Sequence, residues 1–64
     1  MTYQPGQVMD AIVDGEKTLV YLTLSELDVD GNPRWRYAPQ VDPDQDIIEQ
    51  GVTVEIIGVF DRFK

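Results

Sequence analysis

The sequence contains no cysteine and no histidine. Disulfide bonds and Cys/His-type zinc or haem sites are therefore excluded. The same absence removes the usual general base at neutral pH, the Ser-His-Asp triad and any thiolate nucleophile. The two Asp-rich stretches, 28–32 and 42–46, lack the Gly and Glu that an EF-hand loop requires at its sixth and twelfth positions. We therefore expect no catalytic residue, no enzyme activity, no cofactor and no metal.

Basic residues are scarce. Five Lys and Arg stand against twelve Asp and Glu, which gives a net charge of −7. None of the five lies within residues 38–60. Because phosphate binding needs clustered Lys and Arg to displace counterions, this balance argues against nucleic acid as a partner.

Long apolar runs are also missing. No run approaches the roughly 18 residues of a membrane-spanning helix. Residues 1–6 lack the basic and apolar regions of a signal peptide. We therefore expect no membrane segment and a soluble, cytoplasmic protein.

A length of 64 residues corresponds to one domain, spanning 1–64. A core this small supplies a net stability of only about 3–5 kcal/mol. With 42% hydrophobic residues the chain has enough apolar content to fold. Since disulfide and zinc staples are excluded, stability must come from a well-packed apolar core or from self-association into a homo-oligomer.

Strand patterns dominate the sequence. Residues 7–14, 17–24, 34–37 and 52–61 read as strands, on period-2 alternation or on β-branched and aromatic content. Asp14 and Gly15 precede the second segment and predict a hairpin turn at 15–16. Gly58 within the last segment predicts a bulge or bend. Residues 39–50 predict a long loop with a short extended piece at 47–48.

These elements favour an all-β fold, a small five-stranded antiparallel barrel. The OB-like form is preferred, and the SH3-like form is the alternative. A flat four-stranded sheet would leave one apolar face uncovered, and the sequence predicts no helix to cover it.

The run Arg34-Trp35-Arg36-Tyr37 places basic and aromatic residues on alternate sides of a strand. On a barrel such a strand is able to stack bases and hold phosphates, but the net charge disfavours this. The structural interpretation puts Trp35 and Tyr37 in the core and pairs the arginines with carboxylates. The third interpretation is a protein-binding hot spot, for which these residue types are typical. We expect Trp35 to be at least half buried, whereas a surface hot spot would leave it exposed.

Asp42, Asp44 and Asp46 form an acidic row within the loop. If that segment is extended, its like charges lie about 6–7 Å apart. A solvated acidic loop is the favoured interpretation, with a weak cation site as the less favoured one. A row of this kind also suits a basic partner protein, and we take these three residues with residues 34–37 as candidate partner-binding positions.

Two stretches resemble the soluble C-terminal OB-like domain of the NfeD family. Residues 5–8 (Pro-Gly-Gln-Val) and 12–16 (Ile-Val-Asp-Gly-Glu) look like its opening turn and strand, and residues 46–59 are similar to its closing strand. Together they cover about a third of the chain. The resemblance implies an OB-like barrel in a non-catalytic, protein-contacting role, and it carries over no functional residue.

The sequence therefore predicts a non-catalytic, acidic β-barrel module that mediates protein–protein interaction. The alternative is an acidic inhibitor, of the kind phages encode, that mimics DNA and occupies the nucleic-acid site of an enzyme. Small size, negative charge and missing catalytic groups suit both functions.

Overall fold

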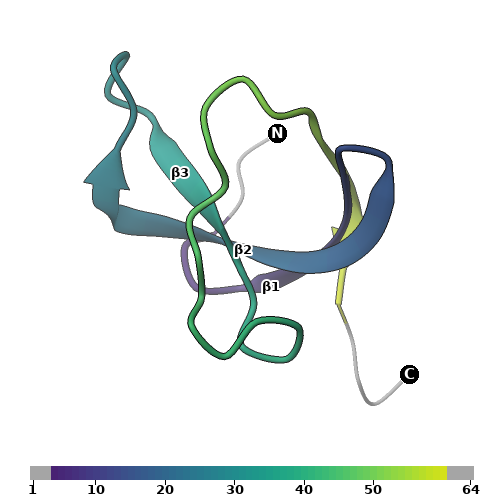
Figure 1. Cartoon of the computed structure of the whole chain (residues 1–64). Coiled ribbons are helices and arrows are strands. Elements are labelled where there is room, and N and C mark those ends of the chain that lie inside the picture. The colour runs from purple at the N-terminus through teal and green to yellow at the C-terminus, as the bar shows by residue number, and fades with distance from the viewer. Residues whose placement is uncertain (1–3, 61–64) are drawn as a thin grey trace.

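The computed structural model describes residues 4–60. Four strands, β1 (Val8–Val13), β2 (Glu16–Leu27), β3 (Pro33–Tyr37) and β4 (Val54–Val59), form one antiparallel sheet in the order β3-β2-β1-β4 (Figure 1). No helix occurs within the described residues, so the all-β prediction is confirmed. The sheet is not closed: within residues 4–60 no ladder joins β4 to β3, and the five-stranded barrel is not complete.

The first hairpin follows from its turn residues. Asp14 and Gly15 both have positive φ, 51° and 84°, which is the backbone of a two-residue type I′ turn. Val13 pairs with Glu16, so the second strand resumes directly after the glycine. The predicted hairpin is confirmed, with its turn one residue earlier than the sequence suggested.

The second strand runs to Leu27, three residues past its predicted end at 24. Its pairing with β3 is regular up to Thr23 opposite Arg34 and resumes only at Leu27 opposite Pro33. The reason lies in the following turn, where one Asp28 carboxylate oxygen accepts the backbone N–H groups of Asp30 and Asn32, each at 2.9 Å. This Asx turn brings β3 back beside the far end of β2.

The core lies on the concave face of the sheet. Its buried residues are Met9, Ala11, Val13, Val20 and Ile48. Four partly buried apolar residues pack against them: Trp35, Tyr37, Val54 and Ile56. The inward period of β1 and the burial of most of Trp35 are thereby confirmed.

The largest fully buried side chain in the described part of the chain is Val20. The aromatic residues that pack on the core, Trp35 and Tyr37, sit at its margin, where they still meet solvent.

The fourth strand carries the predicted irregularity. Asp10 faces Gly58 and Ala11 faces Ile56, so Ile57 is an extra residue opposite β1. A bulge of this kind bends the strand and raises its twist. It leaves Ile57 56% exposed at the margin of the sheet.

The long loop after β3 is fastened at both ends. Tyr37 donates its N–H to the Asp46 carbonyl at 3.0 Å, and Ile48 donates to the Trp35 carbonyl at 2.9 Å. The predicted extended piece at 47–48 is thus confirmed as a bridge on the outer edge of β3. The Asp14 N–H then binds the Thr53 carbonyl at 3.0 Å, beside β1. Between these points the chain crosses from the β3 side to β4 (Figure 1).

Among the described residues there is no helix that is long and apolar enough to span a membrane.

Candidate functional site

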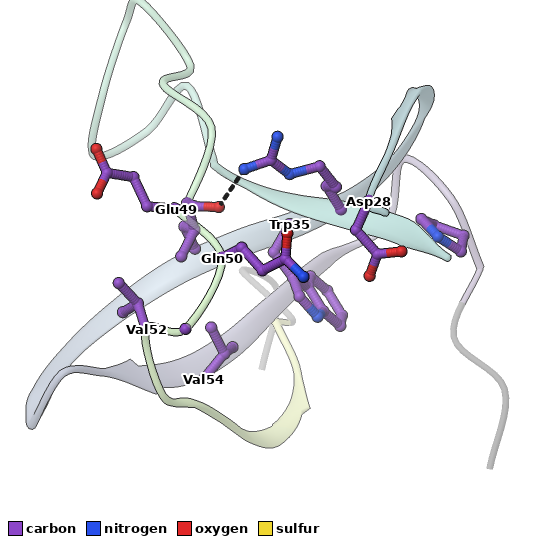
Figure 2. A pocket seen from close by; sticks show the side chains of 10 residues that line it. Asp28, Trp35, Glu49, Gln50, Val52 and Val54 are labelled. Atoms are coloured by element: carbon purple, nitrogen blue, oxygen red, sulfur yellow. Dashed lines mark hydrogen bonds between the residues drawn. The ribbon is translucent and has the colours of Figure 1, made fainter. Parts of the chain in front are cut away.

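A pocket opens where the sheet fails to close, between β3, the loop that leaves its edge, and the first residue of β4. Its volume is about 130 Å³. The apolar part of its wall comes from segments far apart in sequence: Pro33, Trp35, Ile48, Val52 and Val54 (Figure 2). We call this the seam pocket. Of its apolar residues, Val52 is 38% exposed, whereas Ile48 is buried in the core.

The rim of the seam pocket is polar. Asp28, Arg34, Glu49 and Gln50 also line it. Arg34 donates from one guanidinium nitrogen to the Ile48 carbonyl at 3.2 Å, which fastens the loop wall to β3 (Figure 2). Two carboxylates and one guanidinium therefore stand around an apolar floor.

The size of the pocket limits what it holds. Small-molecule sites usually measure about 300–1,000 Å³. A cavity of about 150 Å³ accommodates benzene. The seam pocket, at about 130 Å³, therefore matches a single apolar side chain rather than a substrate.

The predicted hot spot at 34–37 is divided by the fold. Trp35 and Tyr37 pack against the core, but only Trp35 and Arg34 line the seam pocket. Arg36 donates to the Gln45 carbonyl at 2.9 Å, on the far side of the strand from the core. The two arginines therefore hold the loop through its backbone carbonyls, and the Arg36 charge also acts on the Asp46 carboxylate, whose pKa it lowers.

The acidic row is folded rather than extended. One Asp42 oxygen accepts the Asp44 N–H and the other accepts the Asp46 N–H, both at 3.0 Å. The Asp42 N–H itself binds the Ala38 carbonyl at 2.9 Å. The acidic segment is therefore not extended, and the spacing of about 6–7 Å that an extended chain would give does not apply, because Asp42 caps the backbone of its own loop. Asp44 and Asp46 are exposed, as expected of a solvated acidic loop.

This capping moves the pKa values of Asp42 and Asp46 in opposite directions. The Asp46 backbone N–H lowers the pKa of Asp42 below its ordinary value of 3.8. The Asp42 carboxylate in turn raises the pKa of Asp46 above 3.8, against a smaller lowering by Arg36. None of the three aspartates, 42, 44 or 46, lines the seam pocket. Within residues 4–60 no three acidic side chains gather in an arrangement suited to a metal ion.

A second hollow lies on the opposite face of the sheet, beside Val8 and Tyr21, and measures about 200 Å³. The Tyr21 hydroxyl donates to the Gln45 side-chain oxygen at 2.7 Å, so its polar group is already engaged within the protein. No charged residue lines this hollow. It therefore has fewer groups with which to select a binding partner than the seam pocket, which is lined by charged residues.

Sequence reasoning missed most of the seam pocket. Glu49 and Gln50 carried no motif, Asp28 was considered only as part of an Asp-rich stretch, and Val52 was placed in the predicted strand 52–61. They meet only when the loop crosses the open side of the sheet, and β4 begins at Val54, which leaves Val52 in the pocket wall.

Comparison with protein-family models, with curated proteins and with solved structures gave no match. The likeness to the NfeD domain therefore stays a prediction, and the function is argued from the residues of the chain itself.

Proposed function

We propose that this protein is a non-catalytic β-barrel module that binds a segment of another protein at the seam pocket. The observation that carries the proposal is the position of Trp35, whose ring packs on the core while lining an open apolar pocket. Tryptophan is one of the residue types enriched at interaction hot spots, which lie in well-packed pockets.

The strand order supports a particular kind of barrel. Counted with the 46–48 bridge, neighbours in space follow the order of the chain, and the last strand, β4, lies beside the first, β1. An OB barrel has a Greek-key connection instead. The meander order therefore supports the SH3-like alternative, an incomplete barrel with its opening at the seam pocket.

The DNA-mimic alternative gains no support from the acidic loop. A mimic needs carboxylates that face outward at phosphate-like spacing. Both oxygens of Asp42 are instead directed at backbone N–H groups of the same loop.

The test uses two valine variants of the full chain, Val52→Ser and Val41→Ser. Both valines are exposed, at 38% and 48%, but only Val52 lines the seam pocket. Immobilised wild-type and variant proteins are used to capture partners from the lysate of the source cells, with quantitation of each captured protein. We expect a partner that Val52→Ser depletes and Val41→Ser retains. Equal capture by all three proteins, or no capture by any, would contradict the proposal.

A further inference from the structure

We infer that the partner segment is extended and cationic, with one apolar anchor side chain flanked by Lys or Arg. This inference rests on the proposed function, because it names the chemistry of the segment that enters the seam pocket.

The charge around the pocket carries the first step. Figure 2 shows Glu49 and Asp28 on opposite sides of Trp35. The Asp28 carboxylate lies beside the indole, whereas the Glu49 carboxylate is directed away from the indole at the outer rim. A segment that lays its anchor against the indole therefore passes Asp28 directly and meets Glu49 further out along the rim. The one base that lines the pocket, Arg34, uses a guanidinium nitrogen to bind the Ile48 carbonyl and keeps its positive charge, so the two carboxylates outnumber it by one.

The surroundings of the pocket add to this field. Two of its three walls, the loop and β4, belong to residues 38–60, a stretch with no Lys or Arg, in a chain of net charge −7. The third wall, β3, contributes Arg34. Complementary charge at a rim speeds encounter and selects partners. An acidic segment would therefore be repelled by the net negative charge of the rim and of the chain.

The size of the pocket carries the second step. A volume of about 130 Å³ holds one apolar side chain. A helix bound in a groove inserts several anchors, at i, i+3 or i+4, and i+7. A single pocket between β3 and a crossing loop suits a chain that presents one side chain and then continues along the surface, as an extended segment does.

The experiment uses short blocked peptides of one common Gly-Ser framework. The central residue is Leu or Gly, and the flanking residues are Lys, Ser or Glu. Each peptide is titrated into the ¹⁵N-labelled full chain at low and at high ionic strength, and NMR shifts are followed at the Trp35 indole N–H and the Val52 and Val54 amides. We expect the peptide with central Leu and flanking Lys to bind most tightly, the Ser-flanked peptide next and the Glu-flanked peptide least, with the difference reduced by salt.

Two charge variants test the rim itself. Glu49→Gln and Glu16→Gln change the net charge equally, but only Glu49 lines the pocket. For the Lys-flanked Leu peptide we expect Glu49→Gln to weaken binding about two- to fivefold, the range of one exposed ion pair. Glu16→Gln, at the β1–β2 turn, should leave the dissociation constant within error of wild type.

The outcomes separate this inference from the proposed function. If the Ser-flanked and Lys-flanked Leu peptides bind equally at the seam pocket, the pocket stands and the cationic preference is overturned. If no Leu peptide shifts the pocket resonances, or the shifts lie elsewhere, both proposals fall. A dilution series without peptide is the last arm: if the same resonances move with protein concentration alone, the occupant is a second copy of the chain, and the inference is overturned.

Discussion

Replacing Trp35 by alanine tests the core and the pocket together. The indole packs against a core whose fully buried residues are small, with Val20 the largest of those described. A buried tryptophan removes about 150–250 Å² from water, worth about 4–6 kcal/mol at 25 cal/mol per Å². Trp35 is only partly buried, so we expect Trp35→Ala to cost about 3 kcal/mol, the lower end of the range for aromatic-to-alanine changes.

That loss is comparable with the whole stability of the domain, about 3–5 kcal/mol. The variant should therefore retain only about 0–2 kcal/mol, which leaves between a few per cent and half of it unfolded in water, with its urea midpoint lowered by about 3 M for a slope near 1 kcal/mol per M. Trp35 is the only tryptophan, so unfolding is followed by far-ultraviolet circular dichroism rather than by fluorescence.

Leu24→Ala is the control, because Leu24 is 59% exposed. It should stay within about 0.5 kcal/mol of wild type. A Trp35→Ala protein that keeps the wild-type midpoint would refute the packing argument and make Trp35 a purely surface residue.

Two further perturbations follow from the turns. Gly15→Ala should lower the free energy of unfolding by about 1 kcal/mol, because the residue has φ +84° and nothing lies within 4 Å of the added methyl group; an unchanged melting temperature would contradict this. In a ¹³C titration of the carboxyl groups, the pKa of Asp42 should lie below 3.8 and that of Asp46 above it, and Asp42→Asn should lower the pKa of Asp46, since the Asp42 charge is the main cause of its rise. As the pH falls towards 3.8, protonation of Asp46 relieves its repulsion by Asp42 and raises the free energy of unfolding. Only below pH 3.8 is the stabilising contribution of the Asp42 carboxylate lost.

The strands were predictable because they depend on local periodicity. Alternation located β1 and β4 to within about two residues, and the Asp14-Gly15 pair located the hairpin between β1 and β2. The end of β2 was not predictable in the same way. Its last residues have no regular partner on β3. The strand continues to Leu27 because the turn that ends it is built around Asp28, further along the chain than the alternation indicates.

The acidic row at 42–46 was evaluated mainly by its charge, and its local hydrogen bonding was not predicted. Asp28 and Asp42 use the same device: each carboxylate accepts the backbone N–H groups two and four residues further along the chain. In both places Asp recurs at spacing two, so the sequence contained the signal. Local hydrogen bonding outweighed repulsion between exposed, solvent-screened charges.

The seam pocket is a consequence of how the chain ends its sheet. The segment after Ile48 must travel from the outer edge of β3 to the far side of β1, where Thr53 accepts the Asp14 N–H. Ile48 fills part of the open side with a buried side chain, while Val52, further along, stays 38% exposed. Arg34 fixes the start of this crossing by its bond to the Ile48 carbonyl.

No periodicity encodes that crossing, which is why the pocket escaped prediction. The same crossing leaves the Trp35 side of the core incompletely covered. The opening that we assign to a partner therefore lies where the loop, after its bridge to β3, leaves the core beside Trp35 in contact with solvent.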